Sequence, residues 1–265
     1  MHIHFLDPFR PGSSLVHGLD PRVKLVLTVA FILTAALTPV GAWPVYILLL
    51  ALILAVELLS DLGMGYVLKR SMLAAPFVLS ALPLLFTVAG RPLAQLPGLG
   101  WTLSLEGLER FLSLSFKSWI SVQAAIVMSS TMPFPDLLLA MRALKTPRLL
   151  VAVFGLMWRY LFVLADEALR LMRARAARSG RSEQVGLRVG GSLIWRARVA
   201  GGMAGNLFLR GFERSDRIYT AMLSRGYDGE VRAFAQPPLN QSGWLVLWGG
   251  LLLCFLILVL GLLLG

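Results

Sequence analysis

An apolar run from Trp244 to Leu264 lies at the end of this chain and contains no charged residue. Roughly 20 such residues match the thickness of a bilayer core, where only helices and closed barrels satisfy the backbone hydrogen bonds. Trp244 and Trp248 stand at its start, where aromatic side chains anchor helices at the membrane interface. The whole chain is 57% hydrophobic, with a mean hydropathy of +0.74, above the usual share of a soluble domain. We therefore expect a membrane protein.

Four further apolar runs precede the charged middle of the chain, at 25–37, 43–59, 71–89 and 108–130. The first two are slightly short for a span and need flanking residues. The fourth is polar for its length, as its serines, Lys117 and Gln123 show, and such side chains favour packing between helices. The expected fold class is an all-α integral membrane protein, with about five transmembrane helices and three cytoplasmic or interfacial helices.

The net charge of +11 predicts on which side of the membrane the loops lie. Basic residues gather on the cytoplasmic side of membrane proteins. Here they flank the first and third runs, as Arg22, Lys24, Lys69 and Arg70. Asp20 is a candidate N-cap for the first helix, with Pro21 as its first residue. We expect a cytoplasmic N-terminus, an external loop at 91–100, and a multi-pass location in a cell membrane.

The segment from Leu149 to Ala165 has the hydropathy of a span, but two features argue against a simple crossing. Arg159 lies near its middle, at a cost of about 2.5–3.5 kcal/mol on insertion scales. A full crossing would also place the Arg-rich stretch that follows outside the cell. We favour a long helix at the cytoplasmic interface, running to about Arg178. A short amphipathic helix, Leu137 to Lys145 with Asp136 as its cap, precedes it.

A second long helix is predicted from about Leu193 to Ser224, with two different faces. One stripe is basic and contains Arg210, Arg214, Arg217 and Arg225. The opposite stripe contains Phe208, Phe212, Tyr219 and Met222. Glycines at 201, 202 and 205 allow close approach of another helix, and Gly226 is suited to the position after the C-cap.

Each of these two long helices ends on an arginine between small residues. The triplets are Ala177-Arg178-Ser179 and Ser224-Arg225-Gly226. An arginine at a helix C-terminus ordinarily answers the helix macrodipole. Small neighbours, however, leave the guanidinium free to enter a groove and bind a carboxylate through two parallel hydrogen bonds. Both interpretations, a helix cap and a docking residue, remain open on this pattern alone.

Several kinds of chemistry lack their usual motifs. The chain has no P-loop, no H-E-x-x-H, no C-x-x-C and no paired acids for Mg²⁺-diphosphate chemistry, and its lone cysteine, Cys254, excludes a disulfide framework. His2 and His4 could touch a transition metal, but a solvated leader is favoured, so we assign no metal site and no cofactor. Asp166-Glu167 with Arg170 and Arg173 favour helix-surface ion pairs over a proton relay. The hydropathy argues against a nucleic-acid binder.

Nearly the whole chain resembles the transmembrane T component of energy-coupling factor (ECF) importers, and is most similar to the cobalt/nickel (CbiQ-like) type. The resemblance is carried by His17-Gly18-Leu19-Asp20-Pro21-Arg22-Val23-Lys24-Leu25, Pro133-Phe134-Pro135-Asp136-Leu137-Leu138, Trp158-Arg159-Tyr160 with Glu167, Arg173-Ala174-Arg175-Ala176-Ala177-Arg178-Ser179, and Ala221-Met222-Leu223-Ser224-Arg225-Gly226-Tyr227-Asp228-Gly229. The family consensus for both triplets is Ala-Arg-Gly. Ser179 and Ser224 depart from it here, while both arginines are kept.

This resemblance implies a non-catalytic scaffold that works with two ATP-binding subunits and a substrate-binding membrane subunit, in contact with membrane lipid. It also implies a location in a prokaryotic inner (plasma) membrane. It implies that the triplet residues dock on the ATP-binding subunits, namely Ala177, Arg178, Ser179, Ser224, Arg225 and Gly226. It also implies that four residues support the long helices, which would be coupling helices: Arg159, Glu167, Arg173 and Asp228. Closure of the ATP-binding subunits would then move the helix ends and press on the substrate-binding subunit.

The expected organisation is a cytoplasmic leader at 1–21, a four-helix membrane part at 22–130, coupling helices at 131–235 and a final span at 236–265. The cargo would be cobalt or nickel, with a vitamin such as biotin as the alternative. A membrane lipid or isoprenoid transferase is the competing class, and the missing acidic pair argues against it. An independent channel or carrier would need a polar path, whereas only the fourth span is polar.

Overall fold

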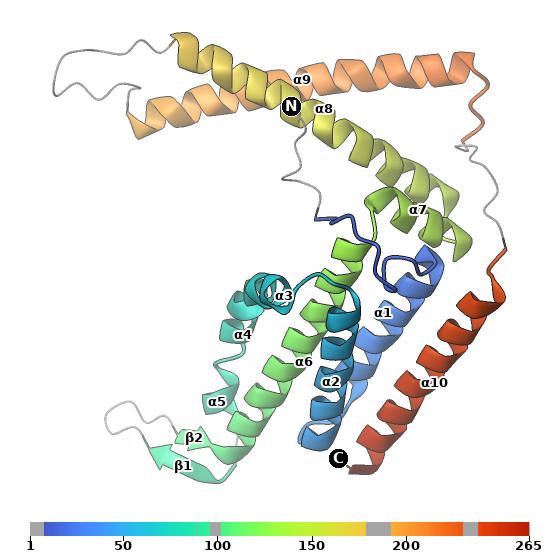
Figure 1. The fold of residues 1–265 in the computed structure, drawn as a ribbon. Helices are drawn as coiled ribbons and strands as arrows, with labels where there is room; N and C mark the ends of the chain where they lie inside the picture. Colours follow the sequence, from blue (N-terminus) through green and yellow to red (C-terminus); the bar gives the residue numbers. More distant parts are fainter. Residues whose placement is uncertain (1–7, 89, 96–101, 179–191, 230–237, 265) are drawn as a thin grey trace. The chain divides into compact units, whose positions relative to one another are not determined.

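A computed structural model of the chain describes residues 8–88, 90–95, 102–178, 192–229 and 238–264 (Figure 1). These form two compact units, Met1–Leu144 with Gln236–Gly265, and Lys145–Ala235. Both are built from helices, which confirms the all-α membrane class. The described part also contains one small two-stranded sheet, with β1 (Pro92–Gln95) inside the expected external loop and β2 (Thr102–Ser104) just after it. Strands of three or four residues are too short to show a hydrophobic period in the sequence.

The first helix, α1 (Pro21–Leu37), begins as its sequence predicts. The side chain of Asp20 accepts a hydrogen bond from the Arg22 backbone N–H at 2.9 Å, and Pro21 is the first helical residue. This arrangement satisfies one of the donors that a helix N-terminus leaves free. α1 then packs against α6 (Leu105–Thr131), α7 (Phe134–Ala143) and α10 (Gln241–Leu264).

α6 is the central helix of this unit and contacts α1, α2 (Trp43–Leu59), α3 (Met64–Ser71) and α5 (Leu84–Thr87). Its polar residues are turned inward, as predicted for helix packing: Ser113 is 1% and Gln123 0% exposed. Lys117 donates to the Thr38 carbonyl, which helix α1 leaves free at its C-terminal end. Apolar side chains of α2, including Leu49 and Ile53, complete the core beside α6.

The third expected span is interrupted, which corrects the prediction of one helix at 71–89. Helical structure begins earlier, at Met64, and continues as α3, the short 3₁₀ helix η1 (Met72–Ala74), α4 (Ala75–Ser80) and α5. The breaks lie beside Pro76 and Pro83, each of which removes a backbone donor and crowds the preceding turn. A Cβ at Gly107 would lie 2.7 Å from the Leu84 carbonyl oxygen, so this glycine allows the broken segment to approach α6.

The short helix α7 begins at Phe134, behind Pro133, and ends at Ala143. Asp136 therefore lies in its first turn and is not its cap, a correction to the predicted start at Leu137. A proline at the second helical position needs no backbone partner, and this allows the earlier start. α7 packs against α1 in the first unit.

Four helical segments of the described chain are long and apolar enough to cross a membrane: Met64–Thr87, Leu105–Thr131, Arg148–Arg178 and Gln241–Leu264. Trp43–Leu59 is apolar but shorter. The predicted final span is confirmed as α10, which begins three residues earlier than its apolar run. Arg148–Arg178 also meets the length and hydropathy requirement, so its placement along the membrane surface stays a prediction.

Candidate functional site

The second unit is built on two long helices, α8 (Arg148–Arg178) and α9 (Leu193–Ser224). Each is continuous, and α9 has the bounds that its sequence predicts. The side chain of Ser192 accepts from the Trp195 backbone N–H at 3.2 Å and so caps the start of α9. The predicted α8 extends one residue further toward its N-terminus, to Arg148.

α8 and α9 cross each other near their middles (Figure 1). At the crossing, Gly211 lies against Leu164: a Cβ on this glycine would be 3.7 Å from the leucine Cδ2. Beside it, Nη1 of Arg210 donates to Oε1 of Glu167 at 3.0 Å. Later positions of α8 meet earlier positions of α9, so the helices run in opposite senses. The C-terminal ends of α8 and α9 therefore lie on opposite sides of the crossing.

The Glu167–Arg210 pair corrects one expectation. The sequence favours ion pairs along α8 itself, between Asp166-Glu167 and the arginines at 170 and 173. Glu167 instead pairs across the crossing, with Arg210 on α9. The reason is that Glu167 lies on the crossing face, opposite the basic stripe of α9. The arginine side chain is 59% exposed, so we assign the pair only about 0–1 kcal/mol of stability. The main contribution of the pair is to set which residues of α8 and α9 meet at the crossing.

The end of α9 is closed by its backbone. Gly226 has φ +78°, its N–H donates to the Leu223 carbonyl at 2.9 Å, and the Tyr227 N–H donates to the Met222 carbonyl at 3.0 Å. This is the Schellman pattern, in which the residue after the C-cap adopts a left-handed conformation. Arg225 is the C-cap residue itself. Because the backbone already satisfies these carbonyls, the Arg225 guanidinium is not required for capping.

Both terminal arginines are exposed. Arg178 is the last residue of α8, with the exposed Ala177 before it, while Ser179 lies outside the described residues. Ser224 turns its hydroxyl back to the Thr220 carbonyl at 2.9 Å, and so does not cover Arg225. Within the described residues, neither arginine forms an ion pair. The rise of an α-helix places Arg178 about 16 Å and Arg225 about 22 Å from the Glu167–Arg210 pair, along separate arms.

The four expected support residues differ in their surroundings. Glu167 is half-buried and joins the two helices, whereas Arg159 and Arg173 are exposed on α8. Asp228 is exposed just beyond the α9 cap. The structure thus brings Glu167 to the crossing, where it pairs with Arg210. The sequence pattern placed Arg210 on a basic stripe but did not predict this partner.

α9 also presents apolar side chains to its surroundings. Its half-buried positions recur every three or four residues, on the face that includes Gly211, and Met222 belongs to them. Three residues of the predicted apolar stripe are instead exposed: Phe208 by 71%, Phe212 by 61% and Tyr219 by 56%. With Leu223, at 48%, they form what we call the α9 apolar stripe. These side chains are available for contact with lipid or with another protein.

The histidine that the structure describes has a structural role. The ring of His17 lies 2.6 Å from the Ser14 hydroxyl through Nδ1 and 3.0 Å from the Arg10 carbonyl through Nε2. His2 and His4 lie outside the described residues. Within the described ranges, no group of three or more histidines, cysteines or acids is placed to hold a metal ion.

Comparison with known proteins identifies a family. Residues 12–234 match the family described as CbiQ, cobalt transport protein. The chain is 29% identical over 234 residues to the energy-coupling factor transporter transmembrane protein EcfT of Lactococcus lactis, covering 83% of this chain and 82% of the relative. It is 26% identical over 240 residues to the cobalt transport protein CbiQ of Salmonella typhimurium, covering 85% and 97%. The corresponding EcfT of Lacticaseibacillus paracasei is 26% identical over 269 residues, covering 96% and 97%.

Fold and relatives together define the class: a multi-pass membrane component of a transport system, which is not itself catalytic. Within that class, the chain belongs to the CbiQ cobalt transport protein family and is a CbiQ-like T component of the energy-coupling factor type. Partnership with ATPase subunits and a substrate-binding membrane subunit follows in general from that identity.

Proposed function

We propose that this chain is the energy-coupling scaffold of an ECF-type ABC importer for cobalt or nickel ions. In this proposal the arms of α8 and α9 lie across two ATPase subunits, and Arg178 and Arg225 enter one groove each. The observation that carries the proposal is the crossed pair itself: two helices that end, on opposite sides of the crossing, in exposed arginines between small residues.

The chemistry of the two ends supports docking. A guanidinium offers planar paired donors to a carboxylate, and its neighbours here are too small to block a groove. The Arg225 side chain is not needed to cap α9, because the backbone N–H groups of Gly226 and Tyr227 already donate to carbonyls in its last turn. We infer that the same side chain is held in place by the cap and left free to bind.

The crossing supports transmission of movement. Gly211 against Leu164 and Arg210 on Glu167 join the helices near their middles. The Arg175 guanidinium, 5.9 Å from the centre of the Trp195 ring, joins them again nearer the end of α8, so movement of one helix is passed to the other. We propose that closure of the ATPase subunits brings the arginines together in this way. The α9 apolar stripe then presses on the substrate-binding membrane subunit, which releases its cargo.

We assign cargo recognition to the substrate-binding subunit. Cobalt or nickel is favoured over a vitamin because the matching family and the Salmonella typhimurium relative are both described as cobalt transport proteins. The described part of this chain contributes apolar contact surface and arginines rather than a cluster of metal ligands.

The test is co-purification of the ATPase subunits, together with cobalt uptake, for variants of the two arginines. Truncating one partner of a buried charge pair at an interface costs about 2–5 kcal/mol. We expect Arg178→Ala or Arg225→Ala alone to impair uptake while assembly persists, and the double variant to release the ATPase subunits. Lysine at either position should restore little, because it lacks the planar fork.

Arg214→Ala is the matched control, since it removes an arginine from the same helix but not from its end. It should leave assembly and uptake close to those of the unchanged chain. A double variant that still assembles and transports would show that these arginines are ordinary helix-end residues, and the docking proposal would be wrong.

A further inference from the structure

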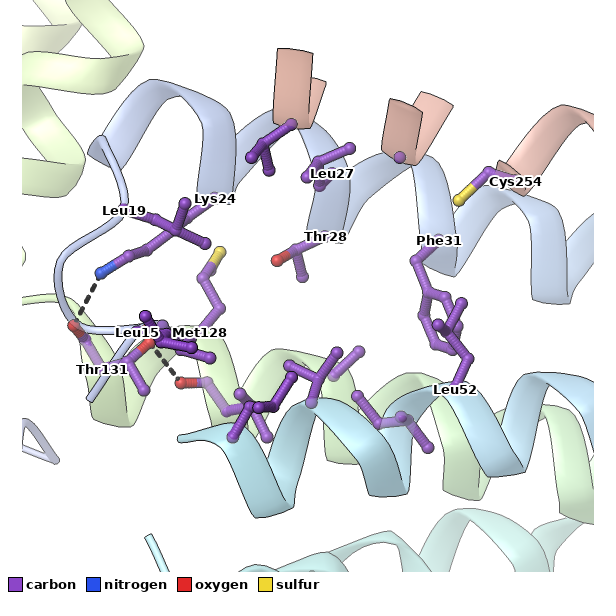
Figure 2. A pocket seen from close by; sticks show the side chains of 18 of the residues that line it. Leu15, Leu19, Lys24, Leu27, Thr28, Phe31, Leu52, Met128, Thr131 and Cys254 are labelled. Carbon is purple, nitrogen blue, oxygen red and sulfur yellow. Dashed lines mark hydrogen bonds between the residues drawn. The ribbon is translucent and has the colours of Figure 1, made fainter. Parts of the chain in front are cut away.

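The first unit contains an apolar cavity of about 560 Å³, lined by α1, α2, α6 and α10 and by the segment that precedes α1. Phe31, Leu52 and Cys254 line one end, and Lys24 and Thr131 line the other (Figure 2). The side chain of Thr28 extends from α1 into the space between these ends. The remaining described lining is almost wholly apolar, so the cavity suits a hydrocarbon with one polar end.

The Lys24 end of the cavity lies at the level of the membrane interface. A Cβ on Gly243 would be 3.9 Å from a methyl group of Val23, so the start of α10 lies beside the start of α1. The next residue, Trp244, is 48% exposed and Trp248 is 64% exposed. Tryptophans in such positions mark the headgroup region of a bilayer. Cys254, ten positions along α10, then lies about 15 Å deeper in the hydrocarbon.

Lys24 is a buried charge with capacity for one more ligand. It is 7% exposed, and its Nζ donates to the carbonyls of His17 at 3.0 Å and Thr131 at 3.1 Å. An ammonium has three N–H donors, so one remains. Asp136 and Asp20 attract it, but within the described residues neither forms an ion pair with it. A buried ammonium with an unused N–H and no direct ion pair among the described residues gains from a further, charge-assisted hydrogen bond to an anionic oxygen.

Residues that line the cavity are also exposed on the outside of α2 and α10. Two of its lining residues, Leu59 and Leu253, are 53% and 41% exposed. Toward the other end of α10, a Cβ on Gly261 would lie 3.1 Å from the Thr38 methyl group and 3.7 Å from Val45, so the helices close together there. The space is therefore a wedge that opens to the bilayer, where lipid chains are the apolar molecules at hand.

We propose that this cavity is a binding site for one acyl chain of an anionic phospholipid, whose phosphate lies at Lys24. The volume falls within the range of sites for small molecules. The apolar walls fit the chain, the interfacial level of Lys24 fits the headgroup, and the free N–H fits a phosphate oxygen. The lipid bridges α1, α2, α6 and α10, and so ties the final span to the rest of the unit.

The experiment uses the full-length chain in nanodiscs that contain phosphatidylglycerol or phosphatidylcholine with a photoactivatable group on the acyl chain. After irradiation, labelled peptides are mapped by mass spectrometry. We expect phosphatidylglycerol to label peptides containing Phe31 and Cys254, and unlabelled phosphatidylglycerol to compete better than phosphatidylcholine. Lys24→Gln should weaken this competition about tenfold, the effect of losing one charge-assisted hydrogen bond.

Thr28→Phe, which places a ring between the two ends of the cavity, should sharply reduce the label on the peptides that contain Phe31 and Cys254. Val29→Phe is its matched control, because it adds the same ring to the next residue of α1, which is 47% exposed and outside the cavity. The competition in the unchanged chain needs no variant, so a folding defect cannot decide the result. Three results would overturn the proposal: labels confined to outer faces, equal competition by both lipids, or loss of the label when the membrane partner subunit binds.

Discussion

The position of Arg225 depends on a glycine, and this dependence gives a quantitative prediction. Gly226 has φ +78°, and a Cβ there would meet nothing within 4 Å. The cost of Gly226→Ala is therefore the backbone conformation alone, about 1–2 kcal/mol for an L-residue in the left-handed region. We expect Gly226→Ala to destabilise the closed last turn of α9 by that free energy, while the Arg225 side chain itself is unchanged.

The consequence is measurable as binding. Because about 1.4 kcal/mol corresponds to a tenfold change in an equilibrium constant, Gly226→Ala should weaken attachment through Arg225 by about tenfold. The assay is titration of nanodisc-embedded chain with ATPase subunits, in an Arg178→Ala background so that Arg225 is the docking contact under study. Gly226→Asn should lose less, since asparagine tolerates this conformation better than alanine.

Gly229→Ala supplies the control. Its φ is +94° and its surroundings are equally open, but it lies beyond the α9 cap. It carries a comparable backbone cost without opening the turn that holds Arg225. Equal binding by the Gly226→Ala and Gly229→Ala variants would refute the argument that the cap positions this arginine.

Three further predictions concern other parts of the chain. Replacing Arg188 by cysteine, with the native cysteine changed to serine, should allow labelling only from the cytoplasmic side; external labelling would reverse the predicted orientation. Changing His2 and His4 to alanine should leave cobalt uptake near normal, and a loss at unchanged protein level would assign metal binding to this chain. Replacing Phe208 and Phe212 by serine should lower uptake while the ATPase subunits stay bound and stability changes by no more than about 0.5 kcal/mol, as for surface substitutions; normal uptake would exclude the α9 apolar stripe as the contact with the substrate-binding subunit.

Signals carried by neighbouring residues were sufficient to predict several elements. The Asp20-Pro21 pair defined the start of α1, and Gly226 the end of α9, because caps depend on hydrogen bonds between residues a few positions apart. The final span followed from hydropathy alone, since a bilayer demands a minimum length of apolar helix. The exposed ends at Arg178 and Arg225 were likewise readable, because small neighbours identify an uncovered side chain.

Tertiary packing decided what those local signals leave open. Glu167 has arginines within reach on its own helix, yet it pairs with Arg210, because the crossing brings in a partner 43 positions away. Met222 lies on the half-buried face of α9, whereas the helical period of the sequence placed it on the apolar stripe with Phe208, Phe212 and Tyr219. The cavity beside Lys24 is formed by four helices and has no signature in any one of them. Such features depend on contacts between distant segments, whose geometry exists only once the helices have packed.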